Sequence, residues 1–387
     1  MEQALKDLIL ISRSVGRDAM LVQGGGGNTS VKTPDGKSMF VKASGTSLKE
    51  MDAEKGWRKV DLASVRHALA DGGLARMPDQ AREAEILRRL LDSCVDGRKD
   101  GSRPSVESHV HSLLGTCVVH VHAMGIGAFV HSKNGKSALL KRLSGRKLPP
   151  LWIPYCNPGF TLAVKARDLA VAYEKKYGAK PELVLQGKHG IFVGGPTPQK
   201  TLALLRQVVG DCLKGIQWKA PRPAPKPAGR LVREAQDAIQ GAVWKILGQE
   251  VEVRHVWHPV VADLLAQKNA KALVAPDALS PDDLIYTHGR IVWMEKASAA
   301  VVERELEKGH APGKKPPRLY LVKGLGLFVA TLPATAQAVI DTALMVFSVR
   351  RWATKLGGVV PLAPAERNFI LNWEVENYRA KLIEKKK

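Results

Sequence analysis

Short apolar runs alternate along this chain with longer amphipathic stretches. The runs at residues 39–42 and 116–122 are rich in aliphatic and β-branched residues, and two more flank a glycine-bounded turn within residues 183–193, which predicts buried strands. Pro104 followed by apolar positions 110, 113 and 114 predicts a helix entering the core, and the Leu- and Ile-rich stretch near the N-terminus predicts a first helix. Strands that alternate with helices predict an α/β fold.

Composition divides the chain into two parts. Residues 219–229 are rich in proline and lysine, cannot continue a helix, and are predicted to form an extended surface linker. This linker separates residues 1–218, which carry the motifs discussed below, from residues 230–387.

A segment before that linker is weakly similar in sequence to a segment after it. Residues 181–193 align without gaps on residues 317–329, and an apolar helical stretch follows each segment. The alignment places Leu325 where His189 stands. We therefore predict that residues 230–387 are a degenerate repeat that is structural and without metal, packing on the first part or forming an oligomer interface. Chance similarity of two apolar strand–turn segments is the alternative.

Composition and charge limit the class of protein. A chain of 387 residues with 45% hydrophobic residues can bury one large core or two ordinary ones. The most apolar window, residues 110–130, contains histidines, whereas a membrane span needs about 20 nearly uninterrupted apolar residues. The N-terminus lacks a secretory pattern, so we expect a cytoplasmic protein without membrane contact. The four cysteines are scattered without a Cys-x-x-Cys pair, which indicates neither a zinc knuckle nor a disulfide framework.

The chain is strongly basic. It has 59 Lys and Arg against 37 Asp and Glu, a formal net charge of +22, which attracts anions. The basic residues are spread out and are not interleaved with the aromatic side chains that stack on bases. We interpret the charge as a solvated surface that steers phosphorylated substrates, and nucleic acid is not the favoured partner.

The strongest chemical signal is a set of histidines with one carboxylate. His120 and His122 lie two apart on a predicted strand, so they share one face with Cα atoms roughly 6.5 Å apart. Alone, this pair also fits two hydrogen-bonded core histidines. Glu107, near the start of a helix that enters the core, needs a partner if buried, and His189 lies in a turn that can present a ligand. Three imidazoles with a displaceable carboxylate or water match a catalytic divalent ion, most simply Zn²⁺, better than a closed structural site.

Two small-residue loops suggest an anion site. Residues 24–30 contain four consecutive glycines followed by Asn28, Thr29 and Ser30, and Ser44 and Gly45 follow the strand at residues 39–42. Main-chain amides and short hydroxyls can cradle an anion. Considered alone, these loops are better explained as a flexible turn and a hairpin end.

Five short motifs occur in order at residues 24–30, 41–46, 104–107, 120–122 and 188–190. Together they resemble the class II (metal-dependent) aldolase and adducin family over residues 8–212. Segments farther along the chain, up to residue 374, are similar to the aldolase portion of bacterial bifunctional rhamnulose-1-phosphate aldolase/alcohol dehydrogenase proteins. No Gly-x-Gly-x-x-Gly follows a predicted strand, so the dehydrogenase domain is expected to be missing.

The resemblance implies an α/β/α sandwich with a mostly antiparallel central sheet, and a homo-oligomer that is often a tetramer. It implies a lyase that cleaves a rhamnulose- or fuculose-1-phosphate-like ketose 1-phosphate to dihydroxyacetone phosphate and an aldehyde. Glu107 would be a metal ligand that becomes the catalytic acid or base, beside the ligands His120, His122 and His189. The implied phosphate-binding residues are Gly27, Asn28, Thr29, Ser44, Gly45 and Ser105.

Other functions stay open at this point. A 4-epimerase, dehydratase or decarboxylase on a phosphorylated sugar or sugar acid could use the same metal site, and a non-catalytic adducin-like scaffold would need none of it. Relatives use a tyrosine or acidic group from a neighbouring subunit for the proton of the aldehyde fragment, and Tyr155 and Tyr173 are unranked candidates for that role.

Overall fold

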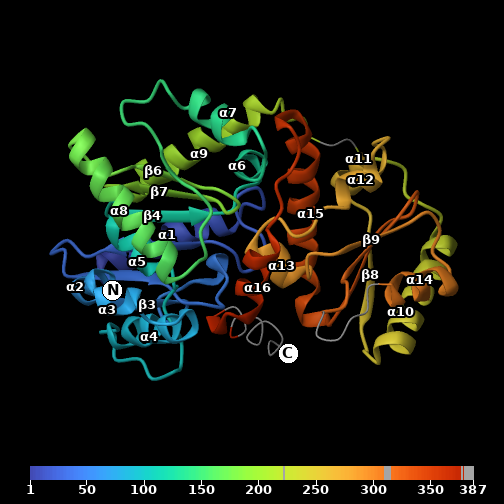
Figure 1. The fold of residues 1–387 in the computed structure, drawn as a ribbon, viewed down its shortest axis with the longest axis horizontal. Coiled ribbons are helices and arrows are strands. Elements are labelled where there is room, and N and C mark those ends of the chain that lie inside the picture. The colour runs from blue at the N-terminus through green and yellow to red at the C-terminus, as the bar shows by residue number, and fades with distance from the viewer. Residues whose placement is uncertain (221–222, 309–314, 376–377, 379–387) are drawn as a thin grey trace.

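The strands form two separate sheets in the computed structural model, which describes residues 1–220, 223–308, 315–375 and 378 (Figure 1). The first sheet has seven strands in the order β3-β2-β1-β4-β7-β6-β5, and the second has four in the order β8-β11-β10-β9. The first sheet contains β1 (Asn28–Lys32), β2 (Ser38–Lys42), β3 (Trp57–Asp61), β4 (Cys117–Val121), β5 (Leu151–Ile153), β6 (Leu183–Gln186) and β7 (Ile191–Gly195). The second contains β8 (Glu252–Val256), β9 (Ile291–Met294), β10 (Leu319–Val322) and β11 (Gly326–Thr331).

Helices flank both sheets. Those in the first part of the chain are α1 (Gln3–Gly16), α2 (Leu62–Ala70), α3 (Gly72–Ala75), α4 (Asp79–Asp92), α5 (Ser108–Leu113), α6 (Met124–Val130), α7 (Gly135–Arg142), α8 (Phe160–Tyr177) and α9 (Pro198–Gly215). Those in the second part are α10 (Gly229–Leu247), α11 (Pro259–Leu265), α12 (Ala270–Val274), α13 (Pro281–Tyr286), α14 (Ala299–Glu307), α15 (Ala336–Ala353) and α16 (Pro364–Asn372). Short 3₁₀ turns lie at Leu48–Glu50, Pro333–Thr335 and Thr354–Leu356.

The first sheet lies between two helical layers. Because side chains alternate along a strand, Val119 and Val121 of β4 pack with α1 and α9, while Val118 packs with α5 and α8 on the opposite face. All neighbouring strands are antiparallel except β5 and β6. The predicted α/β/α sandwich with a mostly antiparallel sheet is confirmed.

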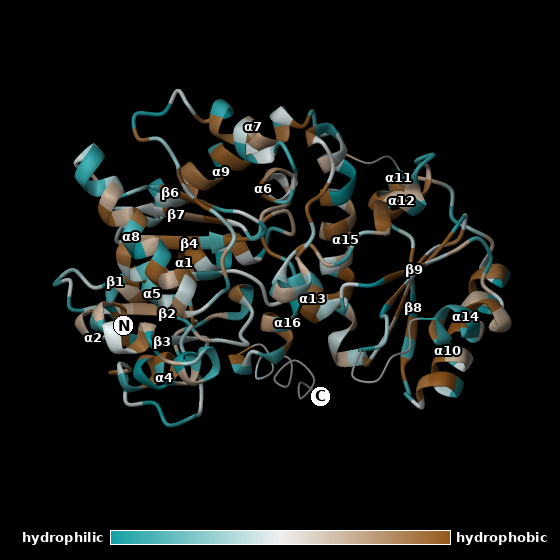
Figure 2. Cartoon of the chain, viewed as in Figure 1, coloured by the Kyte–Doolittle hydropathy of each residue, from teal (hydrophilic) through white to brown (hydrophobic). Residues whose placement is uncertain are grey.

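The second sheet is also covered on both faces. Tyr320 and Phe328 pack against α10 and α14, and Leu321 and Leu327 pack against α11 and α15. Hydrophobic residues follow the strands of both sheets and α15 (Figure 2). The second part of the chain thus has a core of its own.

The two halves share strand topology. The order β4-β7-β6-β5 and the order β8-β11-β10-β9 each give two antiparallel pairs and then a parallel pair. The hairpins also share their register, because Val184 pairs with Phe192 as Tyr320 pairs with Phe328. This agreement supports the predicted degenerate repeat.

Helix α15 joins the halves. It lies between them in Figure 1, and Val349 on α15 comes so close to Gly127 of α6 that a Cβ on Gly127 would be 2.8 Å from the valine side chain. Met124 of α6 belongs to the apolar core built around the second sheet. The predicted linker at residues 219–229 falls between α9 and α10, except that Gly229 is the first residue of α10 and residues 221–222 lie outside the described part. Of the helices in the described residues, none combines the length and apolarity that crossing a membrane requires.

Candidate metal centre and substrate pocket

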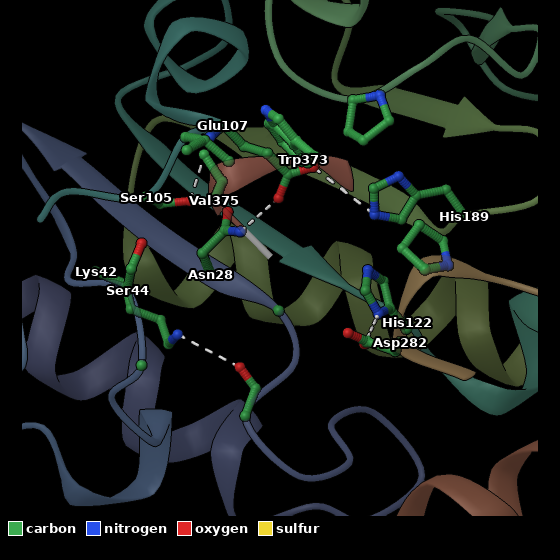
Figure 3. A pocket seen from close by; sticks show the side chains of 16 residues that line it. Asn28, Lys42, Ser44, Ser105, Glu107, His122, His189, Asp282, Trp373 and Val375 are labelled. Atoms are coloured by element: carbon green, nitrogen blue, oxygen red, sulfur yellow. Dashed lines mark hydrogen bonds and ion pairs between the residues drawn. The ribbon is translucent and has the colours of Figure 1, made fainter. Parts of the chain in front are cut away.

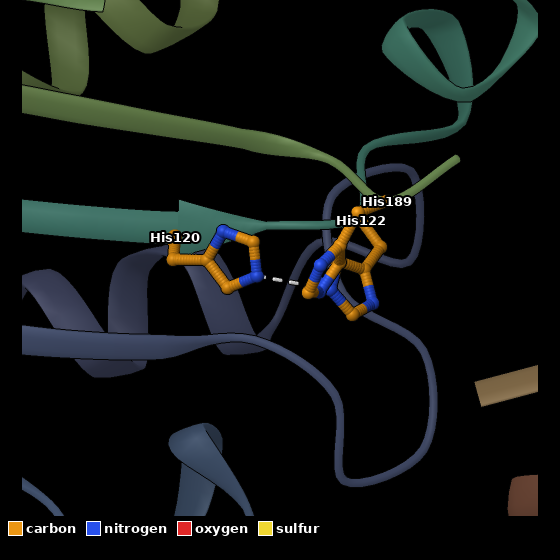
Figure 4. A group of neighbouring side chains, drawn as sticks. All are labelled: His120, His122 and His189. Atoms are coloured by element: carbon orange, nitrogen blue, oxygen red, sulfur yellow. Dashed lines mark hydrogen bonds between the residues drawn. The ribbon is translucent and has the colours of Figure 1, made fainter. Parts of the chain in front are cut away.

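Three histidines meet at one end of the first sheet (Figure 4). His120 lies in β4, His122 follows the end of that strand, and His189 lies in the turn between β6 and β7. The turn is next to β4 because β7 pairs with β4 in the sheet. A Cβ on Gly190 would be 2.6 Å from the Val121 carbonyl oxygen and 2.9 Å from the His122 ring, so only glycine permits this approach.

The ring nitrogens of these histidines converge. Nε2 of His120 is 3.0 Å from Nε2 of His122, and one ligand atom from each of the three rings lies within 4.8 Å of the others. His120 Nδ1 lies 3.0 Å from the Ile191 carbonyl oxygen, and His122 Nδ1 lies 2.6 Å from a carboxylate oxygen of Asp282. Since these oxygens accept hydrogen bonds, both Nδ1 atoms donate to them, and the two Nε2 atoms are the ring nitrogens that face each other.

The imidazoles of His120 and His189 are held in the neutral form. Burial lowers the pKa of His120 and of His189 well below the usual value, and the nearby His122 lowers both further. A neutral imidazole is the form of histidine that ligates a metal ion. Ring nitrogens that converge in this way can be bridged by a cation.

Glu107 completes the group of convergent side chains. Its Oε2 accepts a hydrogen bond of 2.5 Å from Asn28 Nδ2 and lies 3.5 Å from His120 Nε2, and its Oε1 lies 3.8 Å from His189 Nε2. The sheet explains this contact, because Asn28 of β1 pairs directly with His120 of β4. Within the described residues, Glu107 Oε1 is buried without a hydrogen-bond partner.

The structure corrects the predicted place of Glu107 in its helix. The helix expected from Pro104 begins at Ser108, as α5, and Glu107 is the residue that precedes it. Its carboxylate therefore points into the site from the turn that precedes α5 and not from within the helix.

This donor set fits a divalent cation. Three neutral imidazole nitrogens and a carboxylate oxygen are ligands that Zn²⁺ accepts, and the unpartnered Glu107 Oε1 is a buried polar atom that an ion or substrate would satisfy. The triad of His120, His122 and His189 is thus able to hold a metal ion.

A pocket opens beside the histidines (Figure 3). It is lined by Gly25, Gly27, Asn28, Lys42, Ser44, Gly45, Ser105, Val106, Glu107, His122, Pro158, His189, Pro281, Asp282, Trp373 and Val375. Five of the six residues predicted to bind phosphate are therefore at its wall. The exception is Thr29, whose hydroxyl oxygen lies 2.6 Å from that of Ser12 in α1, on the other face of β1. Because neighbouring residues of a strand point to opposite faces, Asn28 and Thr29 could not both face the pocket.

The predicted phosphate loops meet in this pocket. Gly27 has a φ of 68°, and a Cβ there would be 2.8 Å from the His120 carbonyl oxygen, so this position requires glycine. The Ser44 hydroxyl donates to the Pro104 carbonyl at 3.3 Å, and the Ser105 hydroxyl accepts from the Glu107 amide at 3.3 Å. The two loops and the segment before α5 thus form one continuous polar wall.

Lys42 brings a cation to that wall. Its ammonium group is buried and donates to the Gly25 carbonyl at 3.5 Å. Lys32, the other lysine near these loops in sequence, has its ammonium enclosed by the carbonyls of His111, Leu114 and Gly115. The sequence does not distinguish the two lysines, and the structure puts Lys42 at the pocket.

The second half of the chain contributes to the same pocket. Pro281, Asp282 and Trp373 line it, and the Tyr286 hydroxyl accepts a hydrogen bond of 3.2 Å from the Gly25 amide. From the sequence we predicted only a structural role for the second half. Its contribution to this pocket was not predicted. Asp282 is 160 residues from His122, and no motif in the sequence connects them.

The tyrosines considered for the aldehyde proton lie elsewhere. The Tyr173 hydroxyl donates to the Pro149 carbonyl at 2.7 Å, and the ring of Tyr155 lies 5.2 Å from the ammonium of Lys188. Neither residue belongs to the described lining of the pocket.

In the second half, the positions that match the three histidines do not form a second group of convergent ligands. His255 pairs with Phe328 as His120 pairs with Phe192, but its Nε2 is hydrogen-bonded to the Leu325 carbonyl at 2.7 Å. Trp257 follows β8 where His122 follows β4. Leu325 holds the position of His189 in the hairpin, so one histidine of the three has a counterpart.

Comparisons with known proteins relate the chain to one family. The sequence model described as "Class II Aldolase and Adducin N-terminal domain" matches residues 6–212. "Uncharacterized oxidoreductase YuxG" from Bacillus subtilis (strain 168) is 26% identical over 424 residues, which cover 98% of this chain and 58% of that protein. The chain thus spans little more than half the length of this relative.

Solved structures give distant similarities. The N-terminal class II aldolase domain of a conserved protein from Thermoplasma acidophilum is 24% identical with a TM-score of 0.46, covering 56% of this chain and 95% of that one. A sugar-phosphate aldolase from Thermotoga maritima is 12% identical with a TM-score of 0.39, covering 56% and 94%.

Proposed function

The chain belongs to the class II aldolase and adducin family, and we propose that it is a metal-dependent lyase that cleaves a ketose 1-phosphate to dihydroxyacetone phosphate and an aldehyde. The observation that carries the proposal is the junction of two kinds of group in one pocket. The convergent histidines lie on one side of the pocket, the polar wall with Lys42 lies on the other, and Glu107 lies between them, in contact with Asn28 and His120. In a short molecule with a phosphate at one end and a ketone near it, the phosphate would contact the polar wall and the ketone would contact the ion.

The ion, which we propose to be Zn²⁺, would be held by His120, His122 and His189. Because all three ligands are neutral imidazoles, they leave the charge of the ion undiminished. When bound, the ion supplies positive charge that stabilises the negative charge developing beside the ketone as the carbon–carbon bond breaks.

Glu107 is the residue we assign to proton transfer. In cleavage, the bonding electrons stay with the ketone fragment, the hydroxyl proton of the aldehyde fragment passes to solvent water, and Glu107, carrying a proton taken from solvent, delivers it to the carbon that carried the broken bond. In the reverse direction it removes that proton. Asn28 holds Oε2 at 2.5 Å, which leaves Oε1 to carry the proton.

The phosphate would bind at the polar wall that continues from Glu107 toward Lys42. Gly27 and Gly45 allow their amides to approach an anion closely, while Asn28, Ser44 and Ser105 offer short polar side chains. Thr29 supports β1 from the far face in this scheme. The Lys42 ammonium adds a charge-assisted donor.

The test is an assay of the purified protein against a panel of ketose 1-phosphates, with release of dihydroxyacetone phosphate as the readout. We expect release that chelation abolishes and that divalent metal restores. Glu107→Gln should reduce kcat about 10²–10⁴-fold, whereas Glu50→Gln, at an exposed carboxylate, should leave it unchanged.

The alternatives give different results in this assay. A phosphorylated sugar converted without release of dihydroxyacetone phosphate would identify an epimerase, dehydratase or decarboxylase at the same site. Cleavage that persists both in chelator and in Glu107→Gln would refute the mechanism. A protein that retains no metal and converts no substrate would favour an adducin-like scaffold. A phosphorylated small molecule as partner and a homo-oligomeric state also belong to the proposal.

A further inference from the structure

One carboxylate from the second half touches a histidine of the first half. Asp282 Oδ2 lies 2.6 Å from His122 Nδ1, and the two side chains have 7% and 11% of their surface exposed. His122 uses its other ring nitrogen, Nε2, toward His120. The contact therefore lies on the far side of the imidazole from the convergence point.

A glycine lies directly beside this contact and leaves room for it. A Cβ on Gly26 would be 2.8 Å from Asp282 Oδ2 and 3.6 Å from His122 Nδ1. Only a glycine lets the carboxylate and the ring meet at this place.

The turn that carries Asp282 is held by several hydrogen bonds. It lies in the first turn of α13, where the Ser280 hydroxyl accepts from the Asp283 amide at 3.2 Å and Asp283 Oδ2 accepts from the Leu279 amide at 2.9 Å. Buried Arg350 donates to the carbonyls of Pro276 and Asp277 just before this turn. An aspartate on a turn held in this way can fix the orientation of the ring that it touches.

We propose that Asp282 is a positioning residue of the metal centre, so that the centre is built jointly by the two halves of the chain. The carboxylate keeps the proton of His122 on Nδ1, which directs the lone pair of Nε2 at the ion, and its negative charge makes that nitrogen a better donor. This inference rests on the proposed metal site at the three histidines.

The arrangement gives the second half a role in the site. Its own copy of the hairpin carries Leu325 where His189 stands, yet α13 delivers a carboxylate to the intact histidines of the first half. His120 receives the equivalent support from a main-chain carbonyl, that of Ile191, so Asp282 is the side chain through which this support can be altered.

The test is the dissociation constant of Zn²⁺, measured by competition with a chromophoric chelator on the full chain. We expect Asp282→Ala to weaken binding about 10–100-fold, with a smaller loss in Asp282→Asn, because an amide oxygen still accepts from Nδ1–H. Gly26→Ala should also weaken binding, since its methyl group would separate the pair. Asp237→Asn, at an exposed carboxylate on α10, is the matched control and should bind as the wild type does.

A purely structural role for Asp282 predicts a lower melting temperature of the metal-free protein with unchanged Zn²⁺ affinity, and that result would overturn the inference. If Asp282→Ala fails to fold, the tautomer of His122 in the wild type decides, by ¹⁵N NMR of labelled histidine: a proton on Nε2 contradicts the proposal. His189→Ala separates the two claims. If His189→Ala binds zinc normally, the proposed site is wrong, whereas loss in His189→Ala with none in Asp282→Ala rejects this inference alone.

Discussion

Lys188 and Glu366 form an ion pair, with Nζ 2.8 Å from Oε2, that links the turn carrying His189 to α16 in the second half. Lys188 has a φ of 55°, in the left-handed region that non-glycine residues seldom adopt. Such a conformation costs about 1 kcal/mol or more and persists only where neighbouring contacts impose it. The ion pair is one of those contacts, together with the hydrogen bond of 2.8 Å from the Lys188 amide to the Val130 carbonyl.

Breaking this pair should destabilise the protein. The two side chains are 17% and 20% exposed, so we expect Glu366→Gln to lower the free energy of unfolding by about 1 kcal/mol. Urea unfolding of Glu366→Gln, Lys188→Met and the double variant gives the coupling energy. A coupling energy of zero would show that α16 does not stabilise the His189 turn through this contact.

The alternation of His120 and His122, with Glu107 and His189 far from them in sequence, was sufficient to predict the group that the structure brings together. The pair His120 and His122 could be predicted because strand geometry is local, whereas Glu107 and His189 were added from ligand chemistry and from the resemblance to the aldolase family. The prediction that Thr29 binds phosphate was wrong, because its side chain lies on the face of β1 away from the pocket. The sequence does not show at which residue the glycine loop becomes a strand, and this residue decides which side chains face the pocket. Asp282 could not be found at all, because its contact with His122 depends on how the two halves pack through α15.

Glu83 should make the stability of the protein depend on pH. Its buried carboxylate accepts from the Phe160 amide at 3.2 Å, and burial raises the pKa of Glu83 to about 7. The folded chain then holds the proton more tightly than the unfolded chain, so this contribution to stability is full below about pH 4.5 and is lost as the pH rises through 7, by about 3 kcal/mol in total.

Glu83→Gln should remove that loss and raise the unfolding free energy at pH 7.5 relative to the wild type. The comparison is made by denaturant unfolding from pH 4.5 to 8, with Glu54→Gln, at an exposed carboxylate, as the control. Parallel pH profiles for Glu83→Gln and the wild type would contradict the prediction.

The two buried lysines that lie near the predicted phosphate loops in sequence should behave differently. Lys42→Met is expected to raise KM for a phosphorylated substrate about 10–100-fold through loss of a charge-assisted hydrogen bond, and to weaken inhibition by inorganic phosphate. Lys32→Met removes an ammonium that caps the carbonyls at the end of α5, so it should lower the melting temperature and leave KM unchanged. Equal effects of the two variants on KM would contradict the assignment of Lys42 to the phosphate.

Gly190→Ala should damage the metal site directly. The added methyl group would be 2.6 Å from the Val121 carbonyl oxygen and 3.3 Å from the His120 ring, which forces β7 or the histidines to shift. We expect Zn²⁺ affinity to fall by at least about 10-fold, as for loss of a ligand's support. Gly210→Ala on α9, where an added methyl group meets no atom within 4 Å, should bind zinc normally. Unchanged affinity in Gly190→Ala would mean that the ring positions do not govern binding.

The central claim is that one divalent ion binds between the three histidines of the first half. Anomalous X-ray diffraction at the zinc edge, from crystals of the full chain grown with one equivalent of Zn²⁺, tests it most directly. We predict a single peak per chain at about 2.0–2.1 Å from Nε2 of His120, His122 and His189. A peak at any other place, or no peak at this one, would contradict the claim.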